Sequence, residues 1–224
     1  MARDTKATMP LLVGLLILCV VPALGGGARI IEILVGGSMT VENARFFASP
    51  FPVVLHIVAS LVFSIGGAFQ LFYAPPRSTG ARHKLAGRAL VFCGMLASLS
   101  GLWMTQFYPR AVTNFDGHAL YFVRLLVGAA MTFAICCGVQ YSYRRDFVSH
   151  RNWMVRAYAL GLGAGTQVFT HIPWFVFPEL RSELLRTFCM GAGWVINAVV
   201  AEWLIIRLSR PRPVADGLVP EVGQ

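Results

Sequence analysis

The stretch FFASPFPVVLHIVASLVFSIGGAFQLFYAPP, residues 46–76, contains no Asp, Glu, Lys or Arg. A helix needs about 20 residues to cross a hydrocarbon layer of ~30 Å, because each residue adds ~1.5 Å. The same freedom from charge recurs over residues 7–28, 89–109, 125–143 and 157–178, and over 187–206 apart from Glu202. The sequence therefore predicts about six membrane-spanning helices.

Composition indicates the same class of protein. The 224 residues are 56% hydrophobic and 13% charged, whereas soluble domains carry about 25% charged residues. Charges this sparse cannot cover the surface of a soluble protein, so we expect an all-α, polytopic membrane helix bundle. We expect one transmembrane domain over residues 1–208, with its core at 50–178, followed by a disordered cytoplasmic tail at 209–224.

The positive charges predict how the chain is oriented in the inner (plasma) membrane. With a cytoplasmic N-terminus, 13 Lys and Arg residues fall in inner segments and five in outer segments. Lys and Arg favour the cytoplasmic side of a membrane, so both termini are expected in the cytoplasm. The net charge of +9 then reflects topology and contact with anionic lipid headgroups, and no nucleic-acid partner is expected.

The first segment has a second interpretation. Arg3 and Lys6 precede the apolar run at 11–21, and small residues follow Pro22, as in a cleaved signal peptide. The next stretch, 28–47, is too charged and interrupted to span the bilayer. We expect it to lie on the outer interface or to cap the bundle.

Two inner segments share a sequence pattern. HKLAGRAL begins at His83 and HRNWMVRAYAL begins at His150, and an Arg follows each His after five or six residues, at Arg88 and Arg156. An outward-going span follows each segment. This repeated pattern predicts that the second to fifth helices form a parallel two-helix repeat about an axis normal to the membrane. It also predicts that these four residues form one surface at the inner face.

These segments resemble a family of bacterial membrane proteins, domain of unknown function 2306. The family pattern has Leu-His and Gly-x-x-Gln in one helix, then loops of the types H-[RK]-x-x-G-R and H-R-x-W-M-x-R. Here the four motifs are Leu55–His56, Gly67 to Gln70, His83 to Arg88 and His150 to Arg156. The resemblance covers roughly residues 50–178. Many members carry an Arg late in the helix after the second loop, where this chain has Gln167 and His171. The resemblance implies a membrane fold and no particular activity.

Ionisable side chains within a bilayer are costly and are candidates for function. Four of them fall near the outer ends of the second, fourth and fifth helices: His56, His118, Arg124 and His171. We expect these four to face one another in a polar pocket, because an Arg at the centre of a span costs about 2.5–3.5 kcal/mol.

Structural roles are an alternative for several of the candidates. Glu202 is expected to pair with Arg207 or another inner Arg. Arg124 can extend to the outer headgroups. His83 and His150 can cap helices and contact lipid phosphate.

Several functions remain open for these residues. Axial His pairs near each membrane face hold b-type haem in the ascorbate-linked transmembrane di-haem cytochromes; here the pairs would be His83 with His150, and His56 with His118 or His171. Alternatives are a quinone- or lipid-binding module, a small-solute transporter, or a scaffold protein. No metal site is expected, because no carboxylate accompanies the histidines. Nucleotide-loop, zinc-hydrolase and serine-elbow motifs are missing from the sequence, which argues against a kinase or hydrolase.

Overall fold

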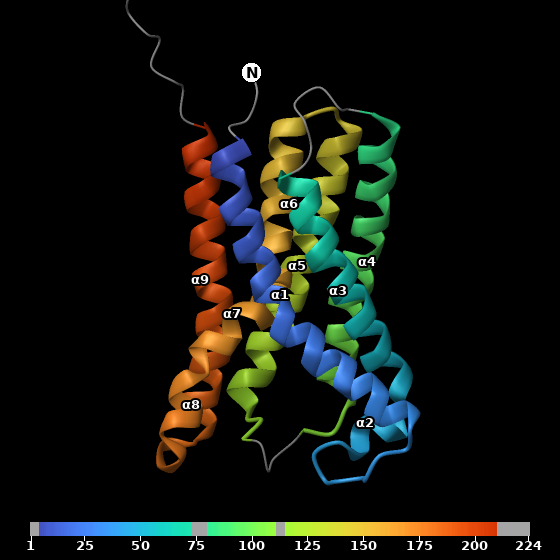
Figure 1. Cartoon of the computed structure of the whole chain (residues 1–224), viewed down its shortest axis with the longest axis vertical. Helices are drawn as coiled ribbons and strands as arrows, with labels where there is room; N and C mark the ends of the chain where they lie inside the picture. Colours follow the sequence, from blue (N-terminus) through green and yellow to red (C-terminus); the bar gives the residue numbers. More distant parts are fainter. Residues whose placement is uncertain (1–4, 73–79, 111–114, 210–224) are drawn as a thin grey trace, which may run out of the picture.

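The computed structural model describes residues 5–72, 80–110 and 115–209, and in these ranges all regular structure is helical (Figure 1). The elements are α1 (Thr5–Leu34), α2 (Ala44–Ala48), α3 (Pro50–Phe72), α4 (Ala81–Phe107), α5 (His118–Tyr143), α6 (Phe147–Gly161), α7 (Gly163–Thr170), α8 (Ile172–Val176), the 3-10 turn η2 (Pro178–Leu180) and α9 (Glu183–Ser209). The inner segment around Arg77 and the tail from 210 lie outside the described residues.

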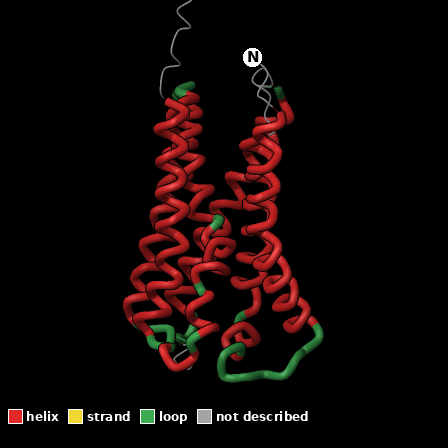
Figure 2. The backbone as a smooth tube through the Cα atoms, turned by 60° about the vertical axis from the view of Figure 1, so that its left-hand side comes forward, coloured by secondary structure: helices red, strands yellow, loops and turns green. Residues whose placement is uncertain are grey.

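The all-α membrane bundle predicted from the sequence is confirmed. Five helices are long and apolar enough to cross a membrane: α1, α3, α4, α5 and α9. The predicted span at 157–178, the fifth along the chain, is not among these five helices. In its place α6 and α7 follow one another between the two ends of the bundle, as Figure 1 shows, and we call this pair the sixth passage because it adds to the five. In the rotated view of Figure 2 most loop segments gather at these two ends. We call the end where α1 begins and α9 finishes the inner end, and the opposite end the outer end.

Two segments expected to be loops are helical. α4 begins at Ala81, so His83 and Arg88 lie in its first turns, and α6 begins at Phe147, ahead of His150. Asp146 caps α6 by accepting a hydrogen bond from the Ser149 backbone N–H at 3.0 Å, and such caps satisfy amides that a helix start leaves free. Basic residues at these positions prolong both helices beyond the apolar runs.

The segment after the first apolar run is also more helical than expected. α1 continues to Leu34 and contains Arg29 and Glu32, which form an ion pair one turn apart. The Asn43 side-chain amide donates to the Glu32 carboxylate at 2.7 Å. This contact folds the following loop back onto α1 and leads the chain through α2 into α3.

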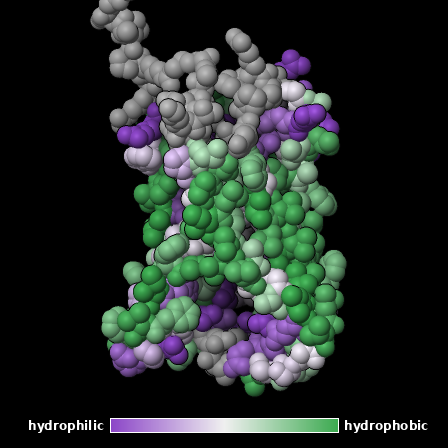
Figure 3. All heavy atoms as spheres, in the orientation of Figure 1, coloured by the Kyte–Doolittle hydropathy of each residue, from purple (hydrophilic) through white to green (hydrophobic). Residues whose placement is uncertain are grey.

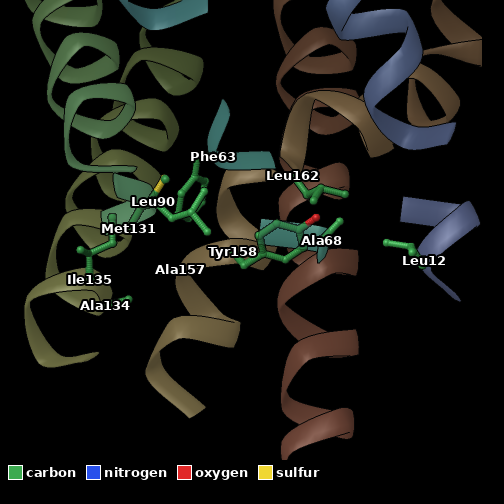
Figure 4. Close-up of a cluster of buried hydrophobic side chains, with 10 residues drawn as sticks. All are labelled: Leu12, Phe63, Ala68, Leu90, Met131, Ala134, Ile135, Ala157, Tyr158 and Leu162. Atoms are coloured by element: carbon green, nitrogen blue, oxygen red, sulfur yellow. The ribbon is translucent and has the colours of Figure 1, made fainter. Parts of the chain in front are cut away.

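The core lies where α3, α4, α5 and α6 meet (Figure 4). The rings of Phe63 on α3 and Tyr158 on α6 lie 6.0 Å apart, and the Tyr158 hydroxyl donates to the Ser64 carbonyl at 2.8 Å. Gly94 of α4 allows this packing, because a Cβ there would come within 2.8 Å of the Phe63 ring. The contacts fix α6 against α3.

The sixth passage is interrupted at Leu162, between α6 and α7. Asn197 of α9 donates to the Ala159 carbonyl at 3.0 Å, and the Thr166 hydroxyl of α7 donates to the Asn197 side-chain oxygen at 2.7 Å. Carbonyls in the last turn of a helix lack partners within that helix. Asn197 therefore completes the end of α6 with a partner from another helix.

Candidate functional site: an arginine cluster at the outer end

Asp116 is the centre of a charged cluster at the outer end of the bundle. Its side chain is only 3% exposed. Arg124 of α5 donates to both carboxylate oxygens, at 3.1 and 3.2 Å. Arg186 of α9 donates from Nε at 3.1 Å, and a guanidinium nitrogen of Arg45, on α2, lies 3.8 Å away. We call these four residues the outer arginine cluster.

Local backbone geometry brings Asp116 into this position. Phe115 adopts a positive φ of 56°, and Gly117 is the N-cap of α5, with its N–H bonded to the Phe115 carbonyl at 3.0 Å. A Cβ on Gly117 would collide with the Glu183 carboxylate at the start of α9. The glycine therefore permits α9 to approach the turn that carries Asp116.

The charges within the cluster do not balance. Three guanidinium groups surround one carboxylate, which gives these four residues a net charge of +2 when all are ionised. The Glu183 carboxylate lies nearby against Gly117 but forms no ion pair with these arginines in the described part of the chain. Nε of Arg45 is buried and has no hydrogen-bond partner in the described part of the chain. Burial lowers the pKa of Arg45 from its ordinary value; Asp116 opposes this, while Arg124 and Arg186 reinforce it. The Arg45 side chain is 21% exposed and also donates to the Pro109 carbonyl at 3.1 Å, so Asp116 supplies only part of the compensation for its charge.

A cleft of about 440 Å³ adjoins the cluster between the outer end of α4 and the start of α5. We call it the outer cleft, and its lining residues are Thr105, Gln106, Tyr108, Pro109, Arg110, His118 and Tyr121. Tyr108, Arg110 and Tyr121 also line a smaller cavity that reaches Asp116 and Arg124. The cleft and the cavity share these residues and so form, with the cluster, one polar region at the outer end. The volume of the cleft alone falls within the ~300–1,000 Å³ typical of ligand sites.

The four predicted outer residues take different places. Arg124 belongs to the cluster and His118 lines the outer cleft. His56 donates from Nδ1 to the Ala97 carbonyl of α4 at 2.9 Å. His171 donates from Nδ1 to the Gln167 carbonyl of α7 at 2.8 Å. The structure thus brings Arg124 and His118 to one polar region and gives His56 and His171 separate backbone partners.

Two of the four predicted inner residues, His83 and His150, join neighbouring helices. The Gln70 side-chain amide of α3 donates to the ring and to the carbonyl of His83, each at 3.0 Å. His150 donates from Nδ1 to the Gly138 carbonyl of α5 at 2.7 Å. In both hairpins, the His near the start of the second helix contacts the helix before it.

The other two predicted inner residues, Arg156 and Arg88, have different surroundings. Arg156 forms two hydrogen bonds to Glu202 of α9, at 2.5 and 2.9 Å, and this is the inner Arg with which Glu202 pairs. Arg207 instead lies over the ring of Trp203, 4.5 Å from its centroid. Arg88 is exposed.

Sequence reasoning missed Asp116, Arg45 and Arg186. One signal was available, because Asp116 is the only acidic residue between Glu42 and Asp146. A lone carboxylate beside the start of a span needs a cationic partner. Its partners could not be named in advance, since Arg186 lies 70 positions away along the chain.

Comparison with known proteins identifies a family and nothing narrower. No curated protein and no solved structure matches the chain significantly. The model of the family described as predicted membrane protein (DUF2306) matches residues 53–205. That range runs from α3 into α9 and includes three of the four cluster residues, all but Arg45. The chain therefore belongs to the DUF2306 family of predicted membrane proteins.

Proposed function

We propose that the protein is a membrane-embedded binding protein for an anionic group, which it holds at the outer arginine cluster and the outer cleft. The observation that carries the proposal is the excess of three guanidinium groups over one buried carboxylate. A bound anion would supply the missing negative charge. Arg, rather than Lys, suits phosphate or carboxylate ligands because its planar fork donates two parallel hydrogen bonds.

The cost of uncompensated charge supports a ligand at this place. Cations grouped in a poorly solvated site repel one another, and an effective dielectric constant near 20 gives ~4 kcal/mol for two unit charges at 4 Å. Asp116 relieves part of that repulsion. An anion in the outer cleft would relieve more, and Arg110 and His118 line the path by which it could reach the cluster.

Anion binding fits the outer end better than haem ligation does. His56 donates a hydrogen bond to a backbone carbonyl of α4, and His171 donates one to a backbone carbonyl of α7. The two rings are therefore held by different helices. His118, the third outer histidine, is exposed at the cleft. The haem hypothesis has its own test, because a b-type haem would give a reduced-minus-oxidised absorption band that is lost in His56→Ala.

Binding is also favoured over transport. Discontinuous helices are typical of many transporters, and the sixth passage is interrupted at Leu162. The interruption is closely packed, however: a Cβ on Gly163 would collide with Trp194, and one on Gly165 with the Leu18 backbone. These contacts leave little room for a solute beside the break.

Thermal unfolding of the detergent-purified protein tests the proposal. Inorganic phosphate should raise the midpoint temperature by more than chloride at equal ionic strength, since a ligand that binds only the folded state stabilises it by RT ln(1 + [L]/Kd). Arg124→Gln and Arg186→Gln should abolish the difference between the salts. Arg156→Gln, which breaks an ion pair at the opposite end of the bundle, should retain it.

Asp116→Asn separates an anion site from a purely structural cluster. Without ligand this variant should be less stable than the native protein, because it leaves three neighbouring cations without their carboxylate. Phosphate should then stabilise the variant more than it stabilises the native protein. If phosphate fails to stabilise either one, the cluster only ties α2, α5 and α9 together, and the proposal is wrong.

A further inference from the structure

The depth of the cluster indicates where its ligand comes from. α5 has 26 residues and is therefore ~39 Å long, which exceeds the ~30 Å hydrocarbon core by ~9 Å. With α5 centred, ~4–5 Å would project at each end. Arg124 lies six residues, or ~9 Å, along α5 from His118. Its Cα then lies just inside the hydrocarbon boundary, and Asp116 lies at headgroup level.

The outer end is open toward the side of the bundle. Figure 3 shows a hollow with hydrophilic surface at this end, below apolar surface, and in Figure 1 the outer half of α1 crosses the bundle obliquely at that height. The view is across the long axis of the bundle, so the hollow faces the direction in which lipid lies. A ligand in the membrane plane could enter here without passing through water.

Apolar side chains flank this end of the bundle. On the outer half of α1, Leu24 is 69% exposed and Leu34 78% exposed; on α8 and α9, Phe175 and Phe188 are 68% and 71% exposed. The acyl chains of lipids that lie at the same depth in the membrane can cover such residues. Charged surface at headgroup level beside apolar surface at acyl level matches the division of polarity within a phospholipid.

We propose that the occupant of the outer arginine cluster is the phosphate headgroup of an anionic phospholipid that enters sideways from the outer leaflet. This inference rests on the anion-binding function proposed above and names its substrate class. The phosphodiester would face Arg124 and Arg186, and the headgroup hydroxyls would lie in the outer cleft near Gln106 and Tyr121. A zwitterionic headgroup would bring its own cation beside a cluster that already carries a net +2, and would bind less well.

Three probes test the inference on the full-length protein in a non-ionic detergent. They are dihexanoylphosphatidylglycerol, its deacylated headgroup glycerophosphoglycerol, and dihexanoylphosphatidylcholine. Titration calorimetry should give an affinity for the phosphatidylglycerol at least tenfold higher than for either of the other two. Arg124→Gln should lower that affinity at least tenfold, and Arg156→Gln should leave it unchanged. Asp116→Asn, which adds to the positive excess, should raise it.

The outcomes distinguish the two proposals. Equal binding of glycerophosphoglycerol and phosphatidylglycerol would mean that the acyl chains contribute nothing; the occupant would then be a soluble anion, and the anion-binding function would stand. Equal binding of phosphatidylcholine would overturn the selectivity for anionic lipid. Binding of none of the three, together with no effect of inorganic phosphate on unfolding, would remove both proposals. Should Arg124→Gln fail to fold, Asp116→Asn still decides by the direction of its change.

Discussion

Asn197 of α9 donates its side-chain amide to the carbonyl of Ala159, 3.0 Å away, in the last turn of α6. The same side chain accepts a hydrogen bond from Thr166 of α7. One residue of α9 thus bonds both halves of the interrupted passage. Within a bilayer no water is at hand to satisfy these groups, so the interruption at Leu162 depends on α9.

Asn197→Leu should destabilise the protein by about 1–2 kcal/mol, the upper part of the range measured for hydrogen bonds between membrane helices. The substitution keeps a similar volume but leaves the Ala159 carbonyl and the Thr166 hydroxyl without their partner. Thermal unfolding in detergent measures the change. Val195→Ala is the matched control on the same helix, because the Val195 side chain is 62% exposed on the surface of the bundle. An Asn197→Leu midpoint equal to that of the control would show that α9 does not hold the break.

Glycine substitutions should separate close helix contacts from open ones. A Cβ on Gly165 of α7 would collide with the Leu18 backbone of α1, whereas a Cβ on Gly25 of α1 would meet nothing within 4 Å. Gly165→Ala should therefore cost about 1–3 kcal/mol, as overpacking does. Gly25→Ala should be neutral or stabilising by about 0.5–1 kcal/mol, because Ala favours the helix. Equal midpoints for the two variants would contradict the close contact of α7 with α1.

The apolar runs were sufficient to predict the spans but not their ends. The charge-free run at 125–143 ends at the same residue as α5, His118–Tyr143, but the helix begins seven residues before the run. α4 and α6 begin earlier than expected, since basic residues can continue a helix into the headgroup layer at no cost in apolar burial. Gly161 and Gly165 are four residues apart, a spacing typical of close contacts between membrane helices, and a Cβ on either would collide with a neighbouring helix.

The candidate site was predictable only in part. Arg124 and His118 were singled out because ionisable groups near lipid need partners, and both lie in the polar region described here. The partner itself, Asp116, joins segments more than 60 residues apart in the chain. Such pairings are decided by the tertiary fold, and a single sequence contains no spacing that reveals them. His56 and His171 instead donate hydrogen bonds to backbone carbonyls, and any nearby helix can provide such acceptors.

Reporter fusions test the orientation expected from the charge bias. Fusions after residue 80 and after residue 148 should report a cytoplasmic location, and a fusion near residue 113 should report an external one. The reason is the excess of Lys and Arg at the inner end, which resists translocation. A cytoplasmic signal at residue 113 would show that the chain has the opposite orientation in the membrane. The outer arginine cluster would then lie at the cytoplasmic leaflet, and the proposed entry of lipid from the outer leaflet would be wrong.

The ion pair between Arg156 and Glu202 should contribute unequally when each partner is removed. Both side chains are partly exposed, at 31% and 48%, so Glu202→Gln should cost only about 0.2–1 kcal/mol. Arg156→Gln should cost about 0.5–1 kcal/mol more, because the Arg156 guanidinium also lies 4.7 Å from the ring centroid of Trp153. Thermal unfolding of both variants and of the double variant gives a coupling energy for the pair.

The reversed pair, Arg156→Glu with Glu202→Arg, should recover the ion pair but not the ring contact. A reversed pair as stable as the native protein would mean that Trp153 adds nothing. Equal losses in the two single variants would lead to the same conclusion.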